Sequence, residues 1–222
     1  MIENTFEEGR VLLIDKPLDW TSFDVIRKIR NTIKIKKVGH AGTLDPLATG
    51  LLIVCTGKFT KRINEYMVQE KEYTGTITLG AVTPTYDLES EPENFKSFDG
   101  ITDEIIRETT KQFTGEILQT PPIHSAIKQQ GKPVYLLARK GVDVILEPRK
   151  ITISSFEITN IEMPVISFKV ECTTGTYIRS LANDFGNALG CGGYLSLLRR
   201  TRIGNLLADD AMSVDEFVKT NR

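Results

Sequence analysis

The segment 37–50, KVGHAGTLDPLATG, gathers residue types that could do chemistry. It holds three glycines, one of the two histidines of the chain (His40) and an Asp-Pro step at Asp45. A carboxylate presented by such a loop can act as a nucleophile or as a base. The same letters also suit a helix start, because Asp is a favoured N-cap and Pro fits the first helical position. The spacing alone leaves both interpretations of Asp45 open.

Several other kinds of site find no support in the sequence. The glycines at 39, 42 and 50 match neither nucleotide-binding glycine pattern, and no GxSxG elbow is present. The two histidines have no metal-ligand spacing. The three cysteines are far apart and lack a CxxC pair, which indicates reduced thiols. We therefore expect no metal site, nucleotide site or disulfide framework.

Three more residues could join Asp45. Tyr73 begins an expected strand, where an ordinary half-buried aromatic is the alternative interpretation. Tyr177 and Arg179 flank Ile178 at the start of an expected helix, so each points about 100° away from it. An arginine at such a position is usually on the surface. If Arg179 met Asp45, a bidentate pair could keep the carboxylate ionised.

The formal net charge of −1 at pH 7 conceals an uneven distribution. The segment 27–37 carries six basic residues and no acid, and the segment 197–202 carries three basic residues. The segment 86–108 has eight acids against two bases. Basic runs can be solvated faces, or they can contact the phosphates of a nucleic acid. Both interpretations are open for 27–37 and 199–202.

The overall composition is that of a globular protein of 222 residues, long enough for one sizeable domain. The acidic, polar N-terminus is no secretory signal, and the longest apolar run, at 51–54, is too short to cross a membrane. Together with the reduced cysteines, these features predict a cytoplasmic protein without a membrane partner.

Hydrophobic periodicity predicts helices and strands without strict alternation, so we expect an α+β fold with a mixed, mostly antiparallel sheet flanked by helices and loops. The expected apolar face of the first helix consists of Phe23, Ile26, Ile29 and Ile33. Strands are expected at 11–14, 51–55, 72–80, 149–158, 165–172 and 195–204, and helices at 21–33, 58–68, 102–113, 134–141, 176–190 and 213–219.

Several motifs follow one another along the chain: VLLIDKPLDWTS, KVGHAGTLDPLATGLLIVCTGKFTK, KEYTG, TPTYD, PPIHSAIKQQGKPVYLLARKG and CTTGTYIRSLANDFG…LLRRTRIG. In this order and spacing they resemble the TruB family of tRNA pseudouridine synthases. The resemblance covers about residues 9–212 and implies a single pseudouridine synthase catalytic domain over 1–222, without a C-terminal PUA domain. It further implies that the substrate is the uridine at position 55, in the T loop of tRNA.

The resemblance assigns Asp45 as the catalytic aspartate and Arg179 as the arginine that forms a salt bridge with it. Lys16, in the DKP motif, matches a family lysine that is structural or supports the site. Which step Asp45 performs, as a nucleophile or as a base at the sugar, stays open.

The remaining matched residues belong to substrate binding. Tyr73 matches the tyrosine that stacks on the target base, and Tyr177 and Leu198 match residues that complete the base pocket. His40 occupies the family position beside the displaced T-loop nucleotides. Because a stacked uridine is out of reach, the enzyme is expected to flip the base out of the loop.

Isomerising uridine requires no redox change and no added group, so the resemblance implies that no cofactor or metal is needed. The expected partner is the T stem-loop of tRNA, recognised by shape and with basic segments on phosphates, by a monomer and without a guide RNA. Two other functions stay open: an RNA-binding or tRNA-folding module with little catalysis, and a guide-dependent synthase.

Two residues depart from the family pattern. Asp19 stands where glycine is usual, so a turn with positive φ at this position would have to tolerate Asp. His124 stands where an aromatic residue is more usual, which makes it a packing or RNA-facing substitute.

Overall fold

The computed structural model describes residues 5–123, 128–129, 132–133 and 146–221. The predicted helix at 134–141 and His124 lie outside these ranges. The chain divides into two compact units: unit 1 is residues 1–74 and 197–222, and unit 2 is residues 75–196. The strands β4 (Lys71–Leu79) and β10 (Gly193–Ile203) each contribute to both units.

The sheet of unit 1 is built around β3 (Ala48–Thr56), which is buried over nearly its whole length. Its residues pair with β1 in antiparallel register (Ile14 with Leu52) and with β10 in parallel register (Leu198 with Ala48). The other strands of this unit are β1 (Val11–Lys16) and β12 (Met212–Ser213), which pair in parallel, β2 (Val38–Ala41), antiparallel to β3, and β11 (Leu206–Leu207), antiparallel to β10.

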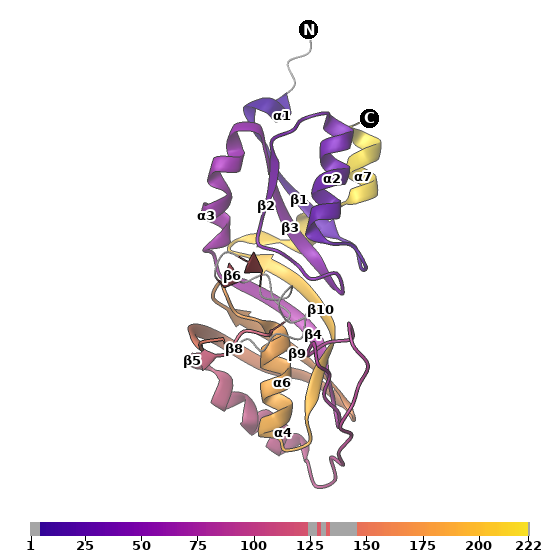
Figure 1. Cartoon of the computed structure of the whole chain (residues 1–222), viewed down its shortest axis with the longest axis vertical. Helices are drawn as coiled ribbons and strands as arrows, with labels where there is room; N and C mark the ends of the chain where they lie inside the picture. Colours follow the sequence, from indigo (N-terminus) through magenta and orange to yellow (C-terminus); the bar gives the residue numbers. More distant parts are fainter. Residues whose placement is uncertain (1–4, 124–127, 130–131, 134–145, 222) are drawn as a thin grey trace. The chain divides into compact units, whose positions relative to one another are not determined.

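Helix α2 (Ser22–Ile33) begins with a capping box in which the Thr21 hydroxyl accepts from the Asp24 amide, while the Asp24 carboxylate accepts from the Thr21 amide. Its buried stripe packs against α7 (Val214–Thr220), beside which it lies in Figure 1. The stripe consists of Ser22, Val25, Ile26, Ile29 and Ile33. The prediction that Phe23 belongs to it is wrong: Phe23 is 60% exposed, because its position is turned about 100° from the centre of the stripe.

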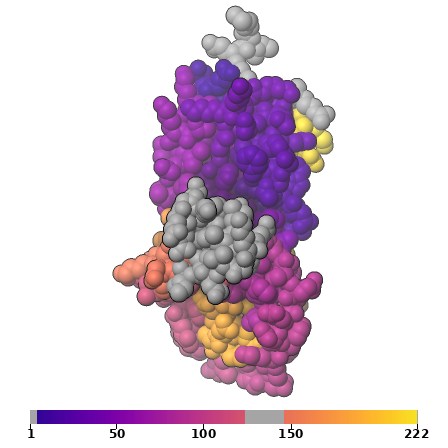
Figure 2. All heavy atoms as spheres, viewed as in Figure 1, coloured from indigo at the N-terminus to yellow at the C-terminus, as the bar shows by residue number. Residues whose placement is uncertain are grey.

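The predicted helix at 58–68 is in part correct, since a 3₁₀ helix, η1 (Gly57–Arg62), is followed by a short α-helix, α3 (Ile63–Met67). Unit 1 also contains the short helices α1 (Thr5–Glu8) and η3 (Ala208–Asp210). In the space-filling view, the segments before residue 75 form most of the visible face of this unit, with α7 at its edge (Figure 2).

The strands of unit 2 confirm the predicted antiparallel pair. β8 (Arg149–Glu162) pairs with β9 (Val165–Cys172) and, on its other side, with β5 (Gly115–Gln119), in both cases antiparallel. Buried and half-buried residues alternate along β4, as expected for Tyr73, Ile77 and Leu79. A two-stranded pair of β6 (Lys128–Gln129) and β7 (Lys132–Pro133) lies off this sheet.

Helix α6 (Ile178–Ala188) buries Phe185 in unit 2, where its ring meets Phe156 edge to face at 5.3 Å and Phe113 at 5.8 Å. The predicted helix at 102–113 is α4 (Asp103–Thr109) continued by the 3₁₀ helix η2 (Thr110–Phe113). In Figure 2, the outer surface of α6 is visible on this unit.

These elements confirm the predicted α+β class, with a mixed and mostly antiparallel sheet. The single catalytic domain over 1–222 stays a prediction. None of the helices within the described ranges has the length and apolar character of a membrane span.

Candidate active site

The Asp45 loop ends in a tight turn. The amide of Ala48 donates to the carbonyl oxygen of Asp45 at 3.0 Å, and β3 begins directly at Ala48. The helix start that the Asp-Pro step also allowed is therefore wrong. Proline suits the second position of a turn as well as the first turn of a helix, and here the turn is what forms.

A buried lysine holds this turn from the side of β1. Lys16 has no exposed surface, and its ammonium group donates to the carbonyl oxygens of Pro17 (2.8 Å), Trp20 (2.5 Å) and Pro46 (3.2 Å). Burial lowers the pKa of Lys16 to about 8, while the negative charge of Asp45 acts in the opposite direction. The three donors of this ammonium thus link the loop after β1 to the Asp45 turn.

Two further residues, one at the start of α2 and one in the loop before it, hold the turn. The Ser22 hydroxyl donates to the Leu44 carbonyl oxygen at 3.1 Å and accepts from the Leu44 amide at 2.9 Å. The amide of Asp19 donates to the Pro46 carbonyl oxygen at 3.0 Å. Asp19 has a φ of 61°, which confirms that Asp occupies the expected positive-φ turn.

A buried arginine spans the base of the same loop. Arg200, on β10, is 1% exposed, and its Nε donates to the Leu51 carbonyl oxygen at 2.8 Å. Its Nη2 donates to the Gly42 carbonyl oxygen at 3.1 Å. The arginine therefore contacts the chain on both sides of Asp45.

The remaining predicted residues of unit 1 lie on strands. His40 is on β2, and burial lowers the pKa of its imidazole; the charge of Arg200 lowers this pKa further, against a backbone hydrogen bond with Gly42 that raises it. Leu198 is buried on β10, in register with Ala48 at the end of the Asp45 turn. Tyr73 is buried on β4. Unit 1 thus carries Lys16, His40, Asp45, Tyr73 and Leu198.

Tyr177 and Arg179 belong to unit 2, at the start of α6. The side-chain amide of Gln119 fixes the backbone of Tyr177: its oxygen accepts from the Tyr177 amide at 2.8 Å, and its nitrogen donates to the Tyr177 carbonyl oxygen at 3.0 Å. The Ser180 hydroxyl donates to the Thr120 carbonyl oxygen at 3.0 Å. The first turn of α6 is thereby attached to the end of β5.

The interpretation of Arg179 as a surface residue is wrong. Arg179 is 5% exposed, its Nε lies 3.6 Å from the Oδ2 of Asp87, and its Nη1 donates to the Thr85 carbonyl oxygen at 3.2 Å. Asp87 is itself buried, and its Oδ1 accepts from the Glu89 amide at 3.0 Å. The TPTYD segment therefore orients the guanidinium within unit 2.

The segment 199–202 is not a fully solvated run, because none of its residues is exposed. Arg199 forms a bidentate ion pair with Asp15, at 3.0 and 2.9 Å, and Arg200 is buried. Arg202 lies 3.8 Å from carboxylate oxygens of both Glu70 and Glu72. Contacts inside unit 1 therefore use the charges of all three arginines.

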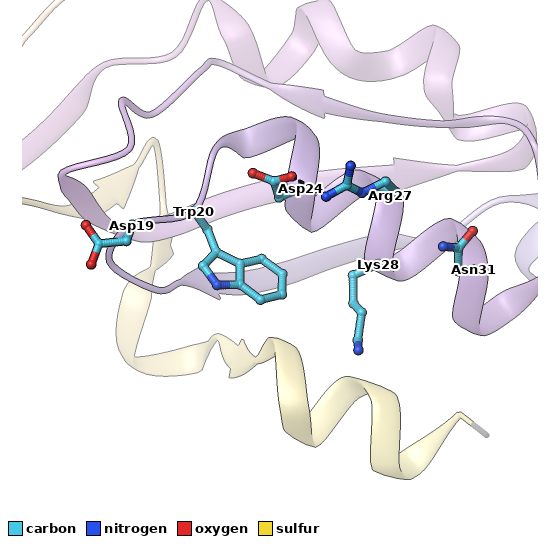
Figure 3. A pocket seen from close by; sticks show the side chains of 6 residues that line it. All are labelled: Asp19, Trp20, Asp24, Arg27, Lys28 and Asn31. Atoms are coloured by element: carbon cyan, nitrogen blue, oxygen red, sulfur yellow. Dashed lines mark hydrogen bonds and ion pairs between the residues drawn. The ribbon is translucent and has the colours of Figure 1, made fainter.

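A surface pocket of about 300 Å³ lies along α2 and the loop that precedes it (Figure 3). The Trp20 ring and the Lys28 side chain point to the same side of the helix in this view. Asp24 and Arg27 form an ion pair at 2.6 Å, so the charges that line the pocket compensate each other in part. The pocket is lined by Asp19, Trp20, Asp24, Arg27, Lys28 and Asn31.

Sequence reasoning missed three residues that hold parts of the predicted site, each within its own unit: Asp87 and Gln119 in unit 2, and Arg200 in unit 1. The sequence did contain a signal that Arg200 faces the same side as a site residue. Residues two apart on a strand share a face, and the resemblance places Leu198 in the base pocket. Gln119 and Asp87 contact residues 58 and 92 positions away in the sequence, and no local pattern indicates such partners.

Solved structures share this fold. One chain in the "Crystal Structure of a Cbf5-Nop10-Gar1 Complex" matches with a TM-score of 0.76 and 30% identity, covering 99% of this chain and 56% of that one. A chain in the "Structure of H/ACA RNP bound to a substrate RNA containing 2'-deoxyuridine" matches with a TM-score of 0.73 and 28% identity, covering 99% of this chain and 55% of that one. The present chain thus spans about half the length of these solved chains.

The family comparison defines the class. Residues 30–178 match the N-terminal domain of "TruB family pseudouridylate synthase", and residues 179–221 match the "tRNA pseudouridylate synthase B C-terminal domain". The fold and the motif around Asp45 are therefore those of a pseudouridine synthase, an isomerase. The chain belongs to the TruB family.

Curated relatives match over almost their whole length. The tRNA pseudouridine synthase B of Flavobacterium johnsoniae is 52% identical, covering 98% of this chain and 98% of the relative. The protein of the same name from Parabacteroides distasonis is 48% identical, covering 97% of this chain and 96% of the relative.

Proposed function

We propose that this chain converts the uridine at position 55, in the T loop of tRNA, to pseudouridine. The observation that carries the proposal is the Asp45 turn: it lies within the residues that match the family's N-terminal domain, and Lys16 holds the turn while Arg200 holds the base of its loop inside unit 1. Relatives about half identical over nearly the whole chain bear the name tRNA pseudouridine synthase B, which supports tRNA as the substrate.

In the proposed reaction, the C1′–N1 bond of the target nucleotide breaks, the uracil rotates, and a C1′–C5 bond forms. The proton on C5 is lost and N1 gains one, so the product is an isomer of the substrate. Asp45 acts at the sugar, either as the nucleophile at C1′ or as a base. Arg179 is proposed as the ionic partner of this carboxylate, already oriented by Asp87 in unit 2.

The target uridine is proposed to flip out of the T loop, with Tyr73 as the stacking surface for its base. Tyr177 and Leu198 complete the base pocket, and His40 lies beside the space that the displaced nucleotides leave. Lys16 supports the Asp45 turn rather than touching RNA, since its three donors already meet carbonyl oxygens.

The RNA is proposed to be free tRNA, bound through the shape of its T stem-loop by a monomer in the cytoplasm, without a guide RNA or a cofactor. Basic residues of the 27–37 segment provide phosphate contacts; Lys34, Lys36 and Lys37 are exposed there.

The test is incubation of the purified chain with an unmodified tRNA transcript, followed by mapping of pseudouridine by mass spectrometry. Pseudouridine at position 55 is expected, and a transcript with cytidine at this position is the matched control. Bound tRNA without any product would refute the proposed activity and favour an RNA-binding module. Product that forms only with an added guide RNA would favour a guide-dependent synthase.

A further inference from the structure

Arg200 is a buried cation for which the proposed reaction has no assigned use. It is among the largest fully buried side chains of the described residues. Its hydrogen bonds run from two different nitrogens to two backbone carbonyl oxygens, those of Leu51 and Gly42. Burying a guanidinium is costly unless its donors are used, so this placement requires both carbonyl groups to stay where they are.

The two carbonyl groups bracket the catalytic loop. Gly42 follows directly after β2, Leu51 lies in β3, and Asp45 falls between them. One rigid, planar group that contacts both positions keeps the two ends of the 42–51 segment at a fixed separation. Lys16 and Ser22 act on the turn itself, whereas Arg200 acts on its base.

Arg200 also ties this loop to the strand that carries Leu198. β10 pairs with β3 in parallel, with Leu198 opposite Ala48 and Arg200 opposite Gly50. At Gly50, a Cβ atom would lie 2.3 Å from the carbonyl oxygen of Arg200, so the two backbones approach as closely as glycine allows. The position of the Asp45 turn is thus defined relative to the strand of Leu198.

We propose that Arg200 is a positioning residue of the pseudouridine synthase site: its guanidinium clamps both ends of the Asp45 loop and sets where the carboxylate lies relative to Leu198. The inference rests on the proposed function, because it assumes that Asp45 is catalytic. It assigns Arg200 no contact with RNA. Its effect is on the chemical step, where misplacing a reacting group by about 1 Å can cost on the order of 10²-fold in rate.

The informative variant is Arg200→Lys, which keeps the charge but removes the rigid, planar group whose separate Nε and Nη2 atoms contact the two carbonyl oxygens. We expect the single-turnover rate of pseudouridine formation to fall by about 10- to 100-fold. The Kd for the same tRNA and its dependence on salt should stay unchanged. The matched control is Arg202→Lys, on the same strand, where a lysine can still pair with Glu70 and Glu72; it should keep the wild-type rate.

Two results would overturn the inference. One is a wild-type rate in folded Arg200→Lys; the other is an unchanged rate with a weaker Kd and a smaller salt dependence, as expected if Arg200 contacts a phosphate. If Arg200→Lys does not fold, Gly42→Ala acts at the other end of the clamp, because Gly42 has a φ of 89° that alanine rarely adopts. That variant should also lose rate without losing affinity, and a wild-type rate would refute the proposal. The wild-type chain in the same assay tests the proposed function by itself: if it forms no pseudouridine, the proposed function fails, whereas the inference about Arg200 depends on the rate of each variant relative to the wild-type rate.

Discussion

Within unit 2, the Nε of Arg179 lies 3.6 Å from the Oδ2 of Asp87, and both side chains are buried. The pair joins the first turn of α6 to the irregular segment after β4, 92 residues apart in the sequence. The guanidinium is thus oriented by its own unit, through groups that do not depend on bound RNA.

Replacing Asp87 by Asn should leave the buried charge of Arg179 without this carboxylate. We expect the free energy of unfolding to fall by about 1–3 kcal/mol, with a lower rate of pseudouridine formation. Urea unfolding and a single-turnover assay measure the two effects. Asp99→Asn, at an exposed acid of the same segment, is the control and should change neither quantity. Equal stability of the two variants would argue against a structural role for the pair.

Lys16 predicts a pH dependence of stability. Burial lowers its pKa from 10.5 to about 8 in the folded chain, so between these values the unfolded chain binds a proton that the folded chain has released. The contribution of Lys16 to stability therefore rises as pH increases from 8 to 10.5, and is lost as pH falls through 8. NMR of ¹³Cε-labelled lysine should show one resonance that titrates near pH 8 and is absent from Lys16→Met. Titration of that resonance near 10.5 would contradict the assignment.

The contact between Gln119 and Tyr177 offers a matched pair of variants. Gln119→Met removes both hydrogen bonds to the Tyr177 backbone, and we expect a loss of about 1–3 kcal/mol in stability. Gln119→Glu keeps the acceptor for the Tyr177 amide but turns a carboxylate toward its carbonyl oxygen, so it should also destabilise the chain. Thermal unfolding at neutral pH measures both changes. Wild-type stability in both variants would show that the two hydrogen bonds between Gln119 and Tyr177 do not stabilise the start of α6.

Gly50 should tolerate alanine much less well than Gly100. Both have positive φ, 101° and 82°, which costs alanine about 1–3 kcal/mol. Only at Gly50 does the new Cβ meet an obstacle, the Arg200 carbonyl oxygen at 2.3 Å; nothing lies within 4 Å at Gly100. Urea unfolding of Gly50→Ala and Gly100→Ala should therefore separate steric overlap from strain. Equal destabilisation would mean that β3 and β10 do not approach this closely.

Much of the fold could be predicted from periodicity. The run LLIV and the alternation along 72–80 indicated β3 and β4, and the caps at Thr21 and Ser213 start α2 and α7. The Asp45 turn was harder to predict, because an Asp-Pro step fits both a helix start and a turn. Only the start of β3 at Ala48 decides between them.

The partners of the charged residues could not be predicted in this way. The charges of 199–202 indicated a surface, although one of them is among the most buried side chains of the described chain. Leu198 and Arg200 are two residues apart on one strand and so share a face, which could have indicated that Arg200 is buried. By contrast, the pairing of Asp87 with Arg179 depends on packing between distant segments. A run of charged residues in the sequence therefore does not show which of its side chains are exposed, because tertiary contacts decide this.

The most direct test of the account is a comparison of Asp45→Asn with the wild-type chain on one unmodified tRNA transcript. Because the substitution removes the charge and nucleophilicity of the carboxylate while keeping its shape, Asp45→Asn should bind the transcript with wild-type affinity and form no pseudouridine at position 55. Pseudouridine formation by Asp45→Asn at the wild-type rate would contradict the central claim that Asp45 performs the chemistry.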